Sequence, residues 1–325
     1  MRGTLARLAP VLHLTRVTTA FGAVANSWFV VLWTRATPAE QAGATGPLLA
    51  RPLWLELAGS AACSVGLFAF AMALNDLLDR RRDSTIHPER PLPSGRLTGT
   101  QAAILLASLL AISLAGAALM GWPAVWMALG TAAAAIAYNT AAKFVPSAGL
   151  VLIGLIYGAQ MMTPNVHLAF VWPVWWAMTH ALLVGALTHK AAERRPVITT
   201  RVKVFAVSGW AFWSLVLLTV GFWRGGLWPA WVSPAASFGP AVLGIGFYLL
   251  GQSILSRPGP AHERAASVQR AGALWLPLYA SAWMFGQGYN AESLLFVGLA
   301  AAGLLGMTVL KEVYGLIEHP VGFVR

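Results

Sequence analysis

The stretch Asn75-Asp76-Leu77-Leu78-Asp79-Arg80-Arg81-Arg82-Asp83 ends a long apolar segment. Within these nine residues lie four side chains that can bind a metal: one Asn and three Asp. If the preceding helix continues at about 100° per residue, Asp76, Asp79 and Asp83 lie within one narrow stripe of its surface. Carboxylates this close repel each other unless a cation lies between them. Oxygen ligands favour a hard ion such as Mg²⁺, which often binds together with phosphate. The stretch therefore predicts a site for Mg²⁺ and phosphate; the alternative is a solvated helix end of mixed charge.

The composition predicts an all-α membrane protein. Of the 325 residues, 58% are hydrophobic and only 10% are charged, whereas about 25% are charged in an ordinary soluble protein. Several apolar runs approach or exceed the ~18–20 residues that cross a bilayer as a helix. The net charge of +11 then indicates loops on the cytoplasmic side rather than a nucleic-acid partner. Cys63 is the only cysteine, so neither a disulfide framework nor a cysteine metal cluster is expected.

Apolar runs separated by polar loops predict a polytopic bundle of nine or ten helices, forming one domain over 1–325. The span at 271–288 decides between nine and ten, because it contains Pro277 and Gln287. Residues 1–25 resemble a cleaved signal peptide in outline, but Arg16 interrupts them and the apolar run continues further, so a retained first helix is expected. The predicted helices cover about 11–34, 53–78, 100–120, 123–142, 147–163, 170–190, 204–222, 236–256, 271–288 and 292–316.

Lysine and arginine residues gather in alternate loops. The loops after the second, fourth, sixth and eighth predicted helices hold most of them, and Arg35, Arg51 and Arg224 are exceptions in the other connections. Because basic loops stay in the cytoplasm, this alternation places the N-terminus and the even-numbered loops there. We therefore expect an integral protein of a bacterial inner membrane whose acidic stretch faces the cytoplasm.

A second helix end repeats part of the first stretch. Asn75-Asp76-x-x-Asp79-Arg80-Arg81 aligns with His189-Lys190-x-x-Glu193-Arg194-Arg195, and both segments end an apolar helix and open a basic loop. The match predicts two pseudo-equivalent halves, at about 11–142 and 147–256, with one site between them and extra helices at about 271–316. In the second segment Lys190 takes the place of an acid, and Glu193 alone keeps a carboxylate.

Four features together resemble the UbiA superfamily of intramembrane prenyltransferases. They are the Asn75-to-Asp83 stretch, the segment Pro88-Glu89-Arg90-Pro91-Leu92-Pro93-Ser94-Gly95-Arg96, the pair Tyr138-Asn139 with Lys143, and Arg16 with Asn26. The resemblance covers about 11–200 well and the last third only by hydropathy. A good first motif combined with a degenerate second one is similar to the UbiA-like EboC group.

The resemblance implies a helical bundle around a central cavity that opens to the cytoplasm and to lipid. It implies an enzyme that moves a prenyl group from a prenyl diphosphate to a lipophilic or aromatic acceptor. Mg²⁺ would neutralise the diphosphate as a Lewis acid, and apolar helix walls would exclude water. Two alternatives remain: a cyclase or lyase that captures the cation within the same molecule, and a non-catalytic protein that binds or moves an isoprenoid for pathway partner proteins.

The resemblance also assigns roles to individual residues. The predicted metal ligands are Asn75, Asp76, Asp79, Asp83 and Glu193. The predicted catalytic residues are Asp76, Asp79, Tyr138 and Lys143. The predicted substrate-binding residues are Arg16, Asn26, Arg90, Ser94, Arg96, Asn139, His189, Lys190 and Arg194. Because the second motif has lost its Asp residues, one Mg²⁺ or two can be expected, with Lys190 and Arg194 binding diphosphate directly.

Each role has a structural alternative. Asn75 could cap the helix end, Asp83 and Glu193 could form ion pairs, and Lys143 could extend its ammonium group to the membrane surface. Arg90 and Arg96 could be ordinary cytoplasmic charges. Within the sixth predicted helix, a polar group is expensive in a membrane, and we expect His180 to bond to a neighbouring helix.

Overall fold

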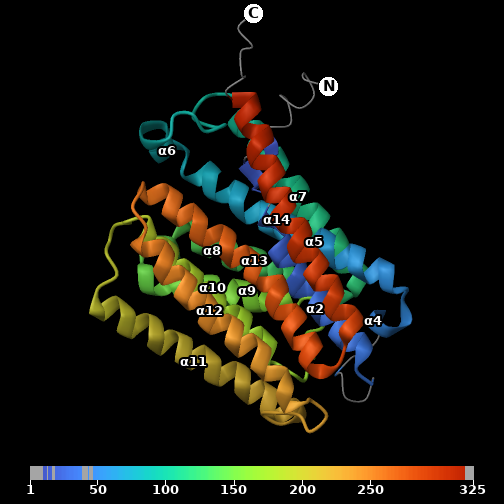
Figure 1. The fold of residues 1–325 in the computed structure, drawn as a ribbon. Coiled ribbons are helices and arrows are strands. Elements are labelled where there is room, and N and C mark those ends of the chain that lie inside the picture. The colour runs from blue at the N-terminus through green and yellow to red at the C-terminus, as the bar shows by residue number, and fades with distance from the viewer. Residues whose placement is uncertain (1–9, 13, 17–18, 39–42, 44–46, 319–325) are drawn as a thin grey trace, which may run out of the picture.

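The computed structural model describes residues 10–12, 14–16, 19–38, 43 and 47–318. Within them the chain is a bundle of long α-helices joined by loops and two short 3-10 turns, η2 at Ala142–Phe144 and η3 at Pro234–Ser237 (Figure 1). This confirms the all-α bundle predicted from the sequence. The helices are α2 Phe21–Ala36, α4 Pro47–Ala50, α5 Leu53–Leu78, α6 Arg80–Ile86, α7 Gly99–Met120, α8 Trp122–Thr140, α9 Pro146–Met162, α10 Trp172–Ala191, α11 Thr200–Gly225, α12 Phe238–Ser256, α13 Ala261–Gln287 and α14 Asn290–Glu318.

Five segments of the described chain are long and apolar enough to cross a membrane, and α9 is a shorter apolar helix. The exact count of nine or ten spans stays a prediction. The five segments are Leu53–Leu78, Gly99–Met120, Thr200–Gly225, Pro234–Ser256 and Asn290–Val309.

Local sequence explains where several helices begin. Pro123, Pro146 and Pro173 each lie in the first turn of their helix, where the missing N–H costs nothing. At the start of α7, Thr98 and Gln101 form a reciprocal capping box, which satisfies two backbone donors. Gly121 joins α7 to α8 with a φ of 110°, a conformation that glycine adopts without steric cost. These signals explain why most predicted helix ends lie close to the observed ones.

Two predicted helix boundaries are wrong. The first helix does not run unbroken through 11–34, because Arg16 has a φ of +46° and α2 begins at Phe21; residues 13 and 17–18 lie outside the described part. The helix predicted at 271–288 begins at Ala261 and continues through Pro277. Its first turns are polar, so hydropathy alone did not identify them as helix.

The core joins the helices in two ways. Close contacts between α5 and α7 form at glycine residues such as Gly59 and Gly116, since small residues allow helix backbones to approach. Elsewhere aromatic rings fill the interior: Trp33 stacks on Phe29 at 5.3 Å and on Phe170 at 5.2 Å. α13 packs against α2, α10, α12 and α14, and α11 lies at the outer edge (Figure 1).

His180 on α10 has the structural role expected for it. Its Nε2 lies 3.0 Å from the carbonyl oxygen of Gly272, and its Nδ1 lies 3.3 Å from the hydroxyl of Tyr279. Both partners belong to α13. The buried imidazole therefore ties α10 to α13.

Candidate functional site

The three aspartates stay on one side of the chain where α5 ends. Helical hydrogen bonding continues across the junction with α6, because the amide of Asp79 donates to the carbonyl of Asn75 (2.9 Å) and the amide of Asp83 donates to that of Asp79 (2.8 Å). Asp76 is 2% exposed and Asp83 is 5% exposed. The spacing thus yields two buried carboxylates, and burial makes each of them require a partner.

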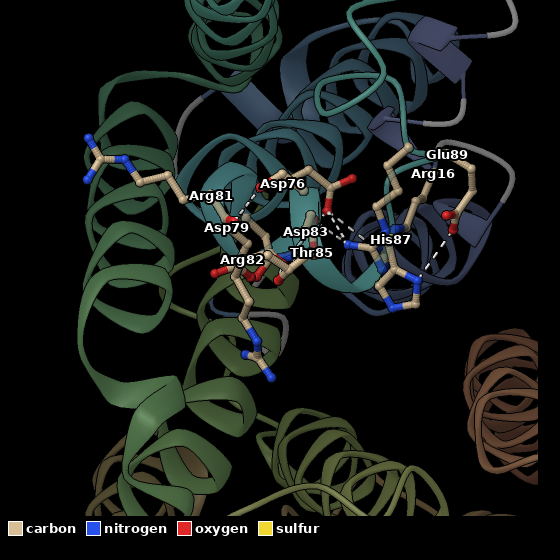
Figure 2. Close-up of polar contacts among 12 residues, drawn as sticks. Arg16, Asp76, Asp79, Arg81, Arg82, Asp83, Thr85, His87 and Glu89 are labelled. Carbon is tan, nitrogen blue, oxygen red and sulfur yellow. Dashed lines mark hydrogen bonds and ion pairs between the residues drawn. The ribbon is translucent and has the colours of Figure 1, made fainter.

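Two arginines supply partners for Asp76 and Asp83, one from far along the chain and one from the loop that follows α6. Arg16 lies 3.3 Å from Asp76. Arg90 lies 2.6 Å from Asp83 and 3.9 Å from Asp76. Figure 2 shows Arg16 beside this cluster. Arg81 and Arg82 are adjacent in sequence, but they extend away from the carboxylates (Figure 2).

Asp79 has a different partner. The ammonium group of Lys143, on η2, lies 2.8 Å from the Asp79 carboxylate and donates to the Asn75 side-chain oxygen at 3.1 Å. Asn75 in turn donates to Asp76 at 3.3 Å. Close by, Asn139 donates to the carbonyl oxygen of Ala71 at 3.4 Å. Lys143 therefore meets the motif directly, while Asn139 contacts α5 one turn before it.

Tyr138, at the end of α8, is within electrostatic range of both predicted segments, because Arg194 and Asp79 each act on its hydroxyl. His189 is held by the following loop, with its Nε2 3.0 Å from the carbonyl oxygen of Pro196. Lys190 and Arg194 are exposed, and neither forms an ion pair with the three aspartates.

Glu193 forms an ion pair with Arg264 on α13, at 2.7 Å, and its side chain is 70% exposed. Its backbone has a φ of +51°, the left-handed conformation that commonly ends a helix and that usually favours glycine. Two hydrogen bonds, from Glu193 to Lys190 and from Arg194 to His189, complete this helix end. The backbone turn directs the Glu193 carboxylate to Arg264 and not to the aspartates.

The loop before α7 is ordered by its own side chains. Arg96 donates to the hydroxyl of Ser94 at 3.1 Å and also to the carbonyl oxygen of Glu89. The Glu89 carboxyl accepts a hydrogen bond from its own backbone amide, which lowers its pKa, and nearby His87 and Arg90 act in the same direction. Ser94 and Arg96 are exposed, so Arg90 is the residue that attaches this loop to the acidic motif.

Asn26 lies apart from this charged cluster. It is 3% exposed, its Nδ2 has no hydrogen-bond partner in the described part of the chain, and it lines a small cavity between α2, α9, α10 and α13. The structure therefore brings Arg16 and Arg90 to the aspartates and places Asn26 in the interior. The other predicted substrate-binding residues on the loop before α7 and at the end of α10 form no ion pair with the three aspartates.

The donor set at the end of α5 fits a magnesium ion in part. The Oδ2 atom of Asp76 is buried and has no hydrogen-bond partner among the described residues, which leaves a carboxylate oxygen for a cation. No group of three or more His, Cys, Asp and Glu side chains is arranged to hold a metal among the described residues. A cation at Asp76 would meet an unused oxygen, whereas a cation at Asp79 would compete with Lys143.

The charges of the cluster balance. Asp76, Asp79 and Asp83 face Arg16, Arg90 and Lys143. Divalent metal and an anionic ligand could therefore enter together, with the metal binding carboxylates and the anion binding the cationic side chains. This is the chemistry of a metal–phosphate site.

Two buried groups were given no role by the sequence reasoning. Glu56, at the opposite end of α5, is fully buried, and neither carboxylate oxygen has a hydrogen-bond partner within the residues that the structure describes. Arg35 and Arg51 act on it electrostatically. These arginines break the alternation of basic loops, a signal that could have drawn attention to Glu56. The other group is a polar contact of Ser27, Ser64 and Gln160 inside the bundle, and serine residues in apolar helices gave too weak a signal.

Comparisons with known proteins agree with this fold. A digeranylgeranylglyceryl phosphate synthase of Natronomonas pharaonis is 29% identical over 90 residues, which cover 28% of this chain and 32% of that protein. The match thus spans about a third of that relative. A solved structure of a digeranylgeranylglyceryl phosphate synthase has a TM-score of 0.54 and 19% identity, covering 86% of this chain and 98% of the other. A UbiA homologue from Archaeoglobus fulgidus has a TM-score of 0.52 and 14% identity, covering 84% and 99%. That homologue has also been solved with GPP and Mg²⁺ bound, with a TM-score of 0.45.

The family itself is shown by a longer match. The model of the UbiA prenyltransferase family matches residues 41–270, more than half of the chain. This helical membrane protein, with its acidic motif at a helix end, belongs to the UbiA prenyltransferase family. The resemblance seen in the motifs is thereby confirmed.

Proposed function

We propose that the chain is a membrane prenyltransferase that moves an isoprenyl group from a prenyl diphosphate to a lipophilic or aromatic acceptor. The single observation that supports this most is the balanced charge cluster at the end of α5. There, three aspartates and three basic side chains lie together where apolar helices end. Such a cluster offers carboxylates to a metal and cationic donors to phosphate oxygens.

In this proposal Mg²⁺ would be held by Asp76 and Asp79, with Asn75 and Asp83 completing its oxygen ligands. When bound, the metal supplies Lewis-acid neutralisation of the diphosphate leaving group. Arg16, Arg90 and Lys143 would then be available to bind diphosphate oxygens. Glu193 would have to leave Arg264 to join the metal ligands.

The remaining predicted residues are proposed to orient the substrate. Lys190 and Arg194 add positive charge from the end of α10, with His189 behind them. Tyr138 and Asn139 lie at the end of α8, and Tyr138 interacts electrostatically with both Asp79 and Arg194. Ser94 and Arg96 hold the loop whose Arg90 reaches the motif.

The orientation in the membrane follows from charge. Basic residues in the loops beside the acidic motif favour a cytoplasmic site, where Mg²⁺ and phosphorylated metabolites are available. We propose an inner-membrane location in a bacterium, with membrane lipid as the surroundings and pathway proteins as partners that supply or receive the isoprenoid.

Purified full-length protein in detergent tests the proposal. It is incubated with a prenyl diphosphate, Mg²⁺ and a membrane-lipid extract as the acceptor source, and diphosphate release is measured while mass spectrometry identifies products. Asp76→Asn and Asp79→Asn should each lower release by roughly 100-fold or more, because electrostatic stabilisation of the leaving group is lost. Glu263→Gln, on the exposed start of α13, is the matched control. Unchanged release in both aspartate variants, with normal melting temperatures, would falsify the proposal.

One observation favours a second function, a non-catalytic isoprenoid-binding protein. Each aspartate of the motif already has a cationic side chain as partner, so the cluster needs no metal to balance its charge. The same experiment distinguishes a prenyltransferase, a non-catalytic binding protein and a cyclase. Binding without diphosphate release identifies a binding protein, and release with a cyclised product in the absence of acceptor identifies a cyclase.

A further inference from the structure

The segment that leads into α11 carries positive charge without acids nearby in the sequence. Four exposed cationic side chains lie within residues 194–203, namely Arg194, Arg195, Arg201 and Lys203. No Asp or Glu occurs between Glu193 and Glu263. None of the four cations forms an ion pair with another described residue. This segment therefore presents uncompensated positive charge at the surface of the protein.

The helix that follows is covered by little other protein. α11 is long and apolar enough to cross a membrane, and only 17% of its most apolar stretch is buried, the lowest share among the five spans of the described chain. It lies at the outer edge of the bundle (Figure 1). In a bilayer, the exposed apolar side chains of such a helix contact acyl chains. Arg201 and Lys203 lie in the first turn of α11, so they lie where this helix enters the membrane.

One exposed face of α11 combines a cation with apolar side chains. Arg201, Phe205 and Phe212 follow one another at helical spacing, so they share this face. Phe205 is 57% exposed and Phe212 is 58% exposed. The guanidinium carbon of Arg201 lies 5.8 Å from the centre of the Phe205 ring, which is within the range of a cation–π interaction. This contact holds the guanidinium group at the start of the apolar face.

This arrangement fits an amphiphile with an anionic head. A guanidinium group binds phosphate oxygens through two parallel N–H donors, and the flexible stem of Lys203 brings a second positive charge to the membrane surface. Acyl chains attached to the phosphate would cover Phe205 and Phe212, whereas a soluble anion would leave both rings exposed. A zwitterionic head would bring its own ammonium group close to these cations, and like charges brought together are unfavourable.

We propose that the start of α11 binds an anionic phospholipid of the adjacent leaflet, with the lipid phosphate at Arg201 and Lys203 and an acyl chain along Phe205 and Phe212. Arg195 in the preceding loop raises the positive potential of the same surface. Each basic residue near a membrane surface strengthens binding to anionic lipid several-fold. A lipid bound there also restrains the loop between α10 and α11. This binding does not require the prenyltransferase activity proposed above.

Native mass spectrometry of the purified full chain measures this binding, with dioleoyl phosphatidylglycerol and dioleoyl phosphatidylcholine as probes. The two lipids share their acyl chains and differ in the charge of the head. Wild-type protein should bind phosphatidylglycerol roughly tenfold more tightly, and the double variant Arg201→Gln, Lys203→Gln should lose this preference. The matched control is Arg81→Gln, Arg82→Gln, which also removes two exposed positive charges. These two arginines lie on α6, apart from the start of α11 (Figure 1), so the control should keep the preference.

Three outcomes would overturn the proposal. Equal binding of the two lipids by wild-type protein is the first, and this comparison needs no variant to fold. The second is a preference that survives in Arg201→Gln, Lys203→Gln with a normal melting temperature, or that falls equally in the α6 control, since overall charge would then attract the lipid. The third is displacement of phosphatidylglycerol by an excess of inorganic phosphate, which would show that the surface accepts an anion without acyl chains.

Discussion

The ammonium nitrogen of Lys143 lies 2.8 Å from a carboxylate oxygen of Asp79, and the two residues are 64 positions apart in the chain. The Lys143 side chain is 12% exposed and that of Asp79 is 18% exposed. This ion pair connects η2 to the end of α5 and occupies an oxygen that the metal proposal assigns to Mg²⁺. In that proposal, lysine and metal would compete for the same carboxylate.

Removal of this competitor should strengthen metal binding. In Lys143→Met the positive charge beside Asp79 is gone, and Mg²⁺ alone should bind roughly tenfold more tightly, because a unit charge at this distance is worth more than a factor of ten in a partly buried site. Thermal unfolding of the detergent-solubilised protein over a MgCl₂ series measures the affinity. Lys203→Met, which removes an exposed lysine on α11, should behave as wild type. An affinity equal to that of wild type in Lys143→Met would show that Mg²⁺ does not bind at Asp79.

Arg90 should control the order of the loop over the motif. It bonds to Asp83 at 2.6 Å, and a hydrogen bond between charged groups contributes about 1.5–3 kcal/mol. In Arg90→Gln we expect amide hydrogen exchange over residues 83–97 to become roughly tenfold faster or more. Arg82→Gln is the control, since Arg82 extends away from the cluster (Figure 2). Equal protection in both variants would mean that the loop is held by its internal contacts with Arg96.

Most of the fold followed from local patterns. Apolar runs and proline positions predicted the second helix at 53–78, as observed. The break at Arg16 could not be predicted, because its side chain bonds to Asp76, 60 positions away. The polar start of α13 was missed because charged helical turns outside the apolar region do not differ from a loop in hydropathy. The division into two halves stays a prediction.

The sequence predicted which residues gather at the site better than it predicted which of them contact one another. The spacing of the aspartates along one helix indicated a cluster, and the structure brings Arg16, Arg90 and Lys143 to it. Which cation faces which carboxylate depends on packing between helices, and local spacing holds no information about that. Glu193 is the instructive case: its alignment with Asp79 suggested a ligand, while its backbone turn and Arg264 direct it elsewhere.

Substitution of Glu193 should show whether its carboxylate binds the metal or stays paired with Arg264. An exposed ion pair contributes about 0–1 kcal/mol, so Glu193→Gln should change the melting temperature little. If Glu193 remains with Arg264 during turnover, the Mg²⁺ dependence of diphosphate release should also match that of wild type. Arg264→Gln serves as the partner control and should give the same result. A weaker Mg²⁺ response in Glu193→Gln alone would place this carboxylate on the metal and restore a second acidic ligand set.

The glycine contact between α5 and α7 should be the most sensitive part of the scaffold that holds the motif. A Cβ at Gly116 would lie 2.5 Å from the carbonyl oxygen of Gly59 and 2.7 Å from the amide nitrogen of Cys63, so the backbones must separate. Overpacking of this kind costs about 1–3 kcal/mol, and Gly116→Ala should lower the melting temperature by several degrees. Gly130→Ala is the matched control, because no atom lies within 4 Å of its added Cβ and alanine favours helix by about 1 kcal/mol. Stability in Gly130→Ala should therefore be unchanged or higher. If both variants melt alike, close backbone packing does not hold α5 against α7.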